Sequence, residues 1–503
     1  MGSGSVQRVP VWAAGGDLTE TAPLRGDVRT DVCVVGAGIA GLSTAYHLAR
    51  SGLAVVVLDD GPIGGGETGR TTAHLSNALD DRYHKLERRF GPGGARRAAE
   101  SHTAAIDVIE AIVAKERIDC EFERLDGYLF APPGESTEEL DRELAAARRA
   151  GLTGVERVAR APLPSFDTGP CLRFPRQGQF HPLRYLAGLA RAIQREGGGI
   201  FTGTAAVRVE GSFAPRVHTA AGPVVSARAV VVATNAPILD ELVTDVVQAA
   251  YRTYALAARV RRGAVPKALY WDTPDPYHYV RLAERGELLI VGGEDHRTGQ
   301  ADDGEERLRR LEKWTRERFP IQEVRYRWSG QIQEPVDGLA FIGRAPTSAA
   351  NLYMVTGDSG HGLTHGTIAG LLLTDLILGR KNDWASLYGP SWLRPVAIRD
   401  FLQENANTVA QYGGWLTPGE VGSEEEIRPG SGAIVRRGLV KFAVYRDEAG
   451  ALHERSAVCP HLGCIVSWNS TEKTWDCPCH GSRFDTAGRV LNSPAKAGLA
   501  GAR

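Results

Sequence analysis

Two short segments near the C-terminus concentrate side chains that can bind metal ions. Together they contain four of the seven cysteines of the chain and two of its 13 histidines. Thiolate sulfur and imidazole nitrogen are common protein ligands of zinc and of iron–sulfur clusters. The sequence therefore predicts a metal centre built from these two segments, which read Cys459-Pro-His461-Leu-Gly-Cys464 and Cys477-Pro-Cys479-His480-Gly-Ser482.

The spacing of these residues bears on the kind of metal centre. A tetrahedral zinc ion would accept two cysteines and two histidines. The patterns Cys-x-His and Cys-x-x-His, however, let each segment supply one thiolate and one imidazole. Two sulfurs can then bind one iron and two nitrogens the other, which is the ligand division of a Rieske cluster. This spacing favours a [2Fe-2S] cluster over zinc.

Both segments resemble those of Rieske [2Fe-2S] proteins. The resemblance implies that Cys459, His461, Cys477 and His480 are the cluster ligands and that Cys464 and Cys479 form the disulfide between the two ligand loops. Ser482 matches a hydrogen-bond donor of the respiratory members, whereas Phe484 stands where they have a tyrosine. Because fewer hydrogen bonds leave the charge of the cluster less stabilised, we predict a reduction potential below that of the respiratory proteins.

A second motif, near the N-terminus, predicts a dinucleotide site. The β-branched segment 31–35 leads into Gly36-Ala-Gly38-Ile-Ala-Gly41, and a helical pattern of apolar residues follows. The first glycine permits the turn, the second lets the backbone approach a pyrophosphate, and the third allows the helix to pack on the strand. Asp59 ends the next predicted strand, where a carboxylate can bind ribose hydroxyls.

The residues that follow favour FAD over NAD. The loop from Gly64 to His74 resembles the loop under the flavin in the D-amino-acid oxidase/glycine oxidase superfamily. No second glycine fingerprint appears downstream, so we expect the substrate to reduce the flavin. The resemblance implies further FAD contacts in three later segments, and the whole predicted set beyond the fingerprint is Thr68, Arg70, Thr71, Thr72, Ala233, Thr234, Gly330, Gly357, Gly360, Gly362, Leu363 and Thr364.

The same resemblance suggests candidates for catalysis. Tyr254, Tyr279 and Arg281 lie in an aromatic, strand-like region that would cover the flavin, and the glycine-rich turn at His361 would direct a helix N-terminus at the flavin N1 and C2 carbonyl. A related amine-oxidising pattern, Gly-His-Gly-Phe-Lys, uses its lysine to hold a substrate carboxylate. This chain has Thr364 at that position, so the carboxylate-bearing substrates of those relatives cannot simply be assigned to this protein.

Asp358, His361 and His365 also allow a different interpretation. Their spacing, Asp-x2-His-x3-His, resembles the non-haem iron triad of Rieske oxygenases. In those enzymes the iron domain follows the cluster, whereas only 23 residues follow His480 here. The flanking glycines also suit close packing on a flavin, so flavin contact is the favoured interpretation.

Length and composition limit the remaining possibilities. The 503 residues suffice for several domains, and a net charge of −1 argues against nucleic acid as a partner. The sequence has neither an apolar run long enough to span a membrane nor a secretion signal, and three cysteines are isolated, so we expect a cytoplasmic protein. The expected segments are FAD-binding at 28–100, 161–250 and 329–380, substrate-binding at 101–160 and 251–328, a linker at 381–425 and the Rieske domain at 426–503.

The predicted fold is therefore an α/β FAD-binding Rossmann-like domain with an interleaved α+β substrate domain, followed by an all-β Rieske domain. Within the substrate part, the segment from Phe122 to Ala131 reads as hairpin-like. The predicted activity is oxidation of a small amine or amino-acid-like substrate by hydride transfer to flavin N5, with single electrons passed through the cluster to an external acceptor. Three alternatives remain: an O2-using oxidase with a structural Rieske domain, a 2-hydroxy-acid dehydrogenase, and a non-enzymatic redox carrier or sensor.

Overall fold

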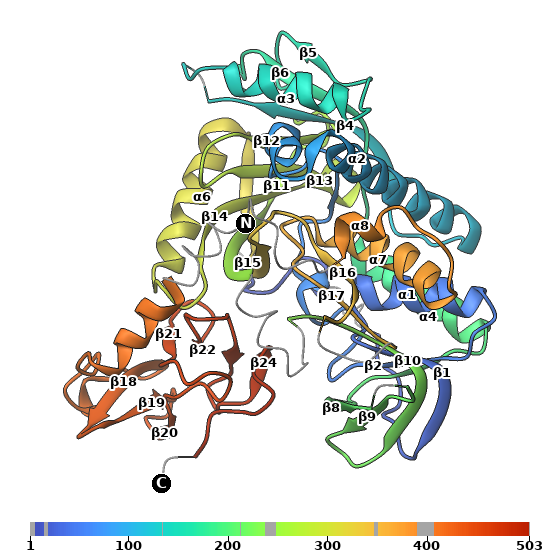
Figure 1. The fold of residues 1–503 in the computed structure, drawn as a ribbon. Helices are drawn as coiled ribbons and strands as arrows, with labels where there is room; N and C mark the ends of the chain where they lie inside the picture. Colours follow the sequence, from blue (N-terminus) through green and yellow to red (C-terminus); the bar gives the residue numbers. More distant parts are fainter. Residues whose placement is uncertain are drawn as a thin grey trace.

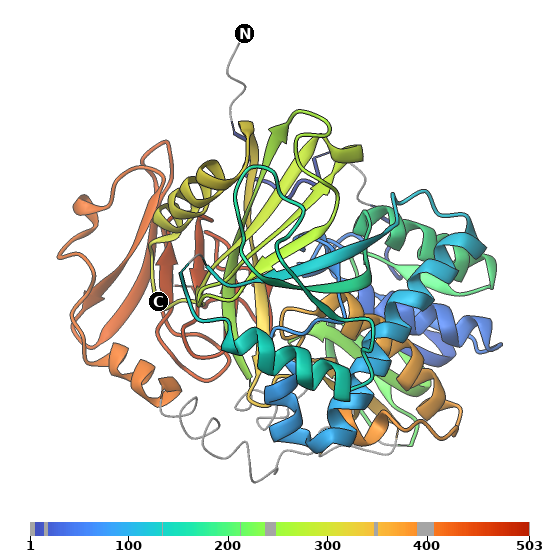
Figure 2. The same cartoon turned by 90° about the horizontal axis from the view of Figure 1, so that it is seen from above.

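The computed structural model describes residues 6–14, 19–132, 134–211, 213–236, 248–346, 351–389 and 407–501. Two large sheets and a small β domain make up this part of the chain (Figure 1). The C-terminal β domain lies on the side of the molecule opposite helices α1 and α4, and Figure 2 shows the same separation from above. The described residues include no helix long and apolar enough to cross a membrane.

The first sheet has a parallel centre formed by the N-terminal motif. Its main path runs β16-β17-β10-β1-β2-β7, with β9 joined to β10 and β8 to β9. Its strands are β1 (Val28–Val35), β2 (Val55–Leu58), β7 (Gly199–Phe201), β8 (Ala206–Glu210), β9 (Arg216–Thr219), β10 (Val224–Asn235), β16 (Phe341–Arg344) and β17 (Leu352–Thr356).

Both faces of this sheet are buried, which explains the continuous apolar runs in its strands. Val32 and Val34 of β1 pack toward the helices, whereas Cys33 and Val35 pack with β9 and β10 on the other face. Helix α1 covers one face of the sheet together with α4 and α7, and it packs against both of these helices. The helices here are α1 (Ile39–Arg50), α4 (Pro182–Arg195), α7 (Gly362–Ile377) and the short α8 (Ala385–Tyr388).

The second sheet is mainly antiparallel and runs β15-β11-β14-β13-β12-β4-β6-β3, with β5 paired to β6. The segment expected to be hairpin-like is instead one strand, β4, which lies between β6 and β12. That expectation was wrong because the pairing partners of β4 are distant in sequence. The strands are β3 (His74–Leu75), β4 (Glu123–Phe130), β5 (Glu156–Val158), β6 (Cys171–Gln179), β11 (Gln248–Val260), β12 (Leu269–Asp272), β13 (His278–Ala283), β14 (Leu288–Arg297) and β15 (Ile321–Pro335).

Three helices accompany this sheet: α2 (Tyr83–Glu116), α3 (Glu138–Arg149) and α6 (Gly304–Arg318). Helix α2 is kinked where Gly91 has a φ of 71° and Pro92 follows. This is the expected effect of proline, which removes a backbone donor. Within the described residues, the 3₁₀ helices are η1 (Glu67–Gly69), η2 (Glu284–Gly286), η4 (Tyr412–Trp415) and η5 (Glu424–Glu426).

The C-terminal domain is built from two small antiparallel sheets, as the predicted all-β fold requires. Its main core contains the fully buried rings of Trp475 and Phe484 together with the cysteines of both ligand loops. The first sheet comprises β18 (Ser431–Arg437), β19 (Val440–Arg446) and β20 (Leu452–Ser456), and the second β21 (Ser467–Asn469), β22 (Thr474–Asp476), β23 (Arg483–Phe484) and β24 (Val490–Asn492). The exact domain boundaries given above remain predictions.

Candidate functional site

A cavity of about 350 Å³ runs from the glycine-rich turn after β1 to the C-terminal domain. Its walls combine residues of both large sheets with Leu491 and Asn492 of β24 and with Ser493, which follows that strand. Most residues predicted to contact FAD or substrate line this cavity, although their roles remain predictions. They are Gly36, Gly38, Asp59, Thr68, Arg70, Thr71, Thr72, Ala233, Thr234, Tyr279, Gly330, Gly360, His361, Gly362 and Leu363.

The glycine-rich turn has the close backbone packing that a dinucleotide site needs. Gly36 has a φ of 109°, and a side chain there would collide with the carbonyl of Ala233. Gly41 does not line the cavity, but a side chain on it would collide with the Gly36 carbonyl, so it serves helix packing. The N-terminus of α1 therefore opens directly onto the cavity, where it can face phosphate groups.

Asp59 at the end of β2 is tied to this turn. Its carboxylate accepts hydrogen bonds from the backbone N–H of Ala37 at 2.6 Å and of Gly61 at 2.8 Å. Burial raises its pKa to about 6 in spite of these two bonds. The residues present thus fit the adenosine half of FAD, with Asp59 near the expected ribose position.

The opposite end of the cavity carries polar and aromatic groups suited to a small substrate. Tyr277 donates to an Asp80 carboxylate oxygen at 3.0 Å, and the His361 Nε2 lies 3.4 Å from the same oxygen. The same Nε2 lies 3.1 Å from the backbone nitrogen of Asp80. Burial alone would raise the pKa of Asp80, but His361 holds it below its usual value, so this carboxylate is anionic at neutral pH.

The Tyr279 ring forms the neighbouring wall of this end. Its hydroxyl is 2.8 Å from the Thr253 hydroxyl, and its ring lies edge-on to His74 with centroids 5.5 Å apart. Burial lowers the pKa of His74 to about 3, so the imidazole is neutral in the folded protein. Tyr277 and Asp80 were not predicted, because no motif marks them in the sequence.

Two predicted catalytic residues lie outside the cavity lining. Tyr254 alternates with Thr253 and Ala255 along β11, and its ring stacks on His296 in a separate core. Arg281 donates to the carbonyls of Ala73 and Phe180, at 2.5 and 3.1 Å. The structure therefore gives Tyr254 and Arg281 packing and loop-holding contacts, and we do not carry them forward as catalytic residues.

Two predicted FAD contacts also lie away from the cavity. The Thr364 hydroxyl is 2.9 Å from His102 Nδ1 on α2. Gly357 has a φ of 73° and packs against Pro335. Neither residue lines the cavity. Both support the turn that begins α7.

The alternative iron triad does not assemble. Asp358 accepts the backbone N–H of Gln333 at 2.9 Å, His361 contacts Asp80, and the His365 Nδ1 lies 2.9 Å from the Asp358 carbonyl. In the part of the chain that the structure describes, the carboxylate and imidazole atoms of these residues do not converge on a common point. Flavin contact by this segment stays a prediction.

The predicted cluster ligands come together in the C-terminal domain. Cys459 and Cys477 are buried and contact each other, and the rings of His461 and His480 have centroids 5.1 Å apart. Cys464 and Cys479 form a disulfide. The Cys477 sulfur lies within 4.8 Å of both, but the disulfide sulfurs cannot act as thiolates, so this trio is not a ligand set. Two thiols and two imidazoles facing one another fit a Rieske cluster.

Backbone hydrogen bonds hold the ligand loops. The Cys459 N–H donates to Cys464, and the Cys477 N–H donates to Ser482, both at 2.8 Å. The buried Ser482 hydroxyl accepts the Ala495 N–H at 3.0 Å, which fastens the loop 492–495 to the second ligand loop. Phe484 lies in the core at the position where a tyrosine would add a donor.

Comparison with known proteins agrees with both halves of this site. Residues 31–376 match the family described as FAD dependent oxidoreductase, and residues 417–502 match the Rieske [2Fe-2S] domain. The chain therefore belongs to the FAD dependent oxidoreductase family and carries a C-terminal Rieske domain. Its cofactors are FAD and a [2Fe-2S] cluster, as predicted.

Individual relatives cover one or both halves. A Bacillus subtilis protein, YhfW, named for a Rieske 2Fe-2S iron–sulfur centre, is 31% identical over 96% of this chain and 95% of its own length. Gamma-glutamylputrescine oxidoreductase of Escherichia coli is 29% identical over 71% of this chain and 85% of its own. Glycine oxidase from Geobacillus kaustophilus shares the fold, with a TM-score of 0.62 at 19% identity, over 73% of this chain and 100% of the other.

Proposed function

We propose that this protein oxidises a small amine, or an amino-acid-like amine, and passes the electrons singly through the Rieske cluster to an external one-electron acceptor. The observation that carries the proposal is the shared cavity: the β24 residues of the cluster domain and the glycine-rich turn of the FAD domain line the same space. A two-electron and a one-electron centre in such proximity favour a relay over a purely structural cluster.

The charges of the cavity favour an amine without a neighbouring carboxylate. Among the described residues that line it, Arg70 is the only lysine or arginine, and its guanidinium is bound to the Ser329 carbonyl at 2.9 Å. Asp80 at the substrate end is anionic, and Ile332 adds an apolar surface elsewhere in the cavity lining. An ammonium group would be stabilised by Asp80, whereas the one guanidinium in the described lining, that of Arg70, is already engaged by the Ser329 carbonyl and lies 3.7 Å from Glu472.

The reaction removes one C–H and one N–H hydrogen from the donor and forms a C=N bond. Bound FAD would supply the hydride acceptor, which takes both electrons, and the N–H hydrogen would leave to solvent as a proton. Asp80 would orient the amine, Tyr277 and His361 would hold Asp80, and the wall formed by Tyr279 would exclude water. Water then hydrolyses the released imine to a carbonyl compound and an amine or ammonia. Two equivalents of the one-electron acceptor are reduced for each donor oxidised.

An anaerobic experiment tests this function. The holoprotein is mixed with glycine, sarcosine, putrescine or γ-glutamylputrescine while the flavin absorbance and the EPR signal of the reduced cluster are followed. We expect at least one amine without an α-carboxylate to bleach the flavin and produce the cluster signal. Bleaching by amines with no cluster signal would favour the O2-using oxidase, and bleaching by none of them would contradict amine oxidation.

The variant His480→Ala tests the relay itself. It removes one predicted ligand, so the cluster signal should disappear while the amine still bleaches the flavin. Electron delivery to ferricytochrome c, used as a one-electron probe, should fall to background. Undiminished cytochrome c reduction by a variant without a cluster would contradict the relay.

A further inference from the structure

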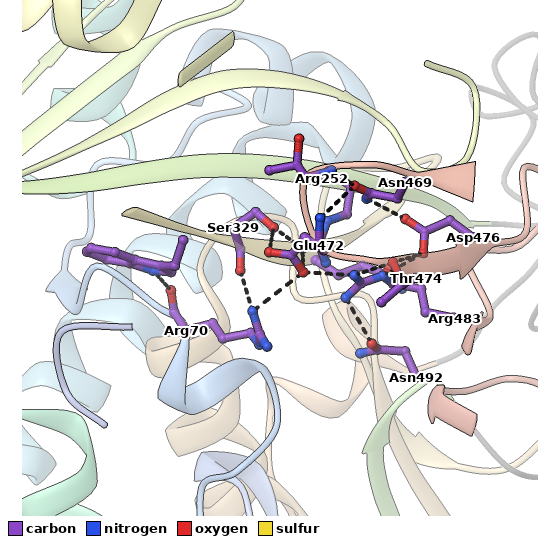
Figure 3. Close-up of polar contacts among 12 residues, drawn as sticks. Arg70, Arg252, Ser329, Asn469, Glu472, Thr474, Asp476, Arg483 and Asn492 are labelled. Carbon is purple, nitrogen blue, oxygen red and sulfur yellow. Dashed lines mark hydrogen bonds and ion pairs between the residues drawn. The ribbon is translucent and has the colours of Figure 1, made fainter. Parts of the chain in front are cut away.

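Glu472 joins the cluster domain to the second sheet. It lies in the turn between β21 and β22, and its carboxylate contacts three arginines from different segments (Figure 3). The Arg252 and Arg483 guanidiniums donate to Glu472 Oε2 at 2.8 Å each, and that of Arg70 lies 3.7 Å away. The Ser329 hydroxyl donates to Glu472 Oε1 at 2.5 Å. Arg70, Arg252 and Ser329 belong to the FAD-containing half of the chain.

This contact is buried, and it joins one carboxylate to oppositely charged guanidinium groups. The side chains of Arg252 and Arg483 are 1% and 2% exposed, and that of Glu472 is 15% exposed. Burial alone would raise the pKa of Glu472, but Arg252, Arg483 and Arg70 hold it well below its usual range. Removing this charge would leave buried guanidiniums without their shared counter-ion, a costly change in a low-dielectric site.

The second ligand loop packs directly on the same sheet. The Gln331 side chain, which lines the cavity, donates from Nε2 to the Gly481 carbonyl at 2.9 Å, next to His480. A side chain at Gly299 would come within 2.7 Å of the Pro478 nitrogen. One contact thus runs from the cavity wall to the residue beside a cluster ligand, and the packing at Gly299 leaves no room for a side chain.

The first ligand loop faces another direction. The Tyr412 hydroxyl donates to the Leu462 carbonyl at 2.7 Å, and the Trp415 indole donates to the Gly463 carbonyl at 2.9 Å. Both belong to η4 and are partly exposed. His461 is also partly exposed, whereas His480 is buried. The two histidine ligands are therefore inequivalent: His480 lies toward the cavity wall, and His461 lies nearer the surface.

We infer that Glu472 is a positioning residue for electron transfer: it fixes the Rieske domain on the second sheet so that the His480 side of the cluster stays against the flavin cavity through Gln331. The inference rests on the proposed function for its kinetic consequence. The docking itself stands on the contacts of Glu472, Gln331 and Gly299. Each transfer moves one electron from the reduced flavin to the cluster, and the external one-electron acceptor removes it.

Two variants test the docking. Glu472→Gln removes the charge, and Gly299→Ala introduces a methyl group against the backbone of the second ligand loop while leaving the interior of both domains unchanged. Glu454→Gln is the control for the first, because Glu454 pairs with Arg437 inside the Rieske domain. Gly263→Ala is the control for the second, because Gly263 also has a positive φ, 81°, with no atom near its missing side chain.

Each holoprotein is mixed anaerobically with an amine that bleaches the wild-type flavin, and flavin and cluster absorbance are followed by stopped flow. Amide hydrogen exchange of segments 329–333 and 477–482 is measured on the oxidised proteins without substrate. In Glu472→Gln and Gly299→Ala we expect cluster reduction to slow by about tenfold or more. Flavin bleaching should be unchanged, exchange in both segments should be faster, and both controls should match the wild type.

The outcomes separate the docking from the function. The inference would be overturned if both docking variants reduced the cluster at the wild-type rate and exchanged their amide hydrogens at the wild-type rate. If Glu472→Gln does not fold, Gly299→Ala decides alone. If the amine bleaches the wild-type flavin but never reduces the cluster, the relay fails, and the exchange data still decide whether Glu472 holds the domains together.

Discussion

At the scale of single residues, the carboxylates of the cavity are not equivalent. Burial raises the pKa of Asp358 to about 7 and that of Asp59 to about 6, so both are partly protonated near neutrality. Asp80 differs because His361 and Tyr277 face its charged form and keep its pKa low. It is therefore the carboxylate at the substrate end with a stable negative charge at neutral pH.

Replacing Asp80 with Asn should weaken amine binding. A hydrogen bond to a charged group is worth about 1.5–3 kcal/mol, so the dissociation constant from anaerobic flavin bleaching should rise about 10- to 100-fold. An anion raises the pKa of a bound amine, so in Asp80→Asn the pH at which bleaching becomes fast should move down by about one pH unit. Asp81→Asn is the control, because Asp81 pairs with Arg89 outside the cavity. Equal effects of both variants would contradict the role of Asp80.

We predict that Phe484 keeps the reduction potential of the cluster below that of the respiratory Rieske proteins. Phe484→Tyr would add a donor at the position where respiratory Rieske proteins have one. A hydrogen bond worth ~1 kcal/mol to the reduced cluster corresponds to about 40 mV for one electron, so the midpoint potential should rise by about that amount. Protein-film voltammetry measures it. Phe442→Tyr makes the same chemical change in the other core of the domain and should leave the potential unaltered.

At the scale of elements, the β1–α1 turn should control flavin content. Gly36→Ala places a methyl group against the Ala233 carbonyl at a φ of 109°, so the turn must open and the pyrophosphate contact is lost. We expect protein that contains iron but little FAD, measured as the ratio of flavin absorbance to iron. Gly52→Ala has the same kind of φ, 83°, with open space around it, and should cost about 1–2 kcal/mol while retaining FAD. Loss of FAD from both variants would point to general instability instead.

The helices and strands that could be predicted from the sequence were those marked by a pattern of neighbouring residues. The strand, glycine turn and helix expected from residue 31 onward correspond to β1 and α1. The hairpin-like interpretation of β4 failed because strand pairing with β6 and β12 is non-local. Likewise, the aromatic residues of β11 and β13 marked the substrate sheet, but the sequence did not reveal which face Tyr254 occupies.

No sequence motif marked the residues that connect the two domains. Glu472 lies in the polar segment 469–473, which reads as an ordinary solvated turn, and its arginine partners lie as far as 402 positions away in Arg70. A charge in a turn is usually exposed. Only the tertiary structure brings Arg252 and Arg483 to it and makes it buried.

At the scale of the whole molecule, the arrangement is compatible with the proposed direction of electron flow, from the flavin through the cluster to an external acceptor. The cavity contacts the His480 side of the cluster domain through Gln331, and His461 lies near the partly exposed residues of η4. A carbon–nitrogen bond is oxidised by two electrons, whereas a cluster accepts one. Under the proposed relay, the two electrons of one amine are therefore divided between the two centres, and the total number of electrons that the protein accepts can be measured.

An anaerobic titration with limiting amine should count these electrons. FAD accepts two and the cluster one, so complete reduction of the wild-type holoprotein should require about 1.5 equivalents of a two-electron donor. The His480→Ala variant, which keeps FAD but loses the cluster, should require about 1.0 equivalent. Flavin absorbance and the EPR signal of the cluster give the two endpoints. A wild-type endpoint at the variant's value would mean that the cluster does not receive electrons from the amine, even though it lies beside the cavity.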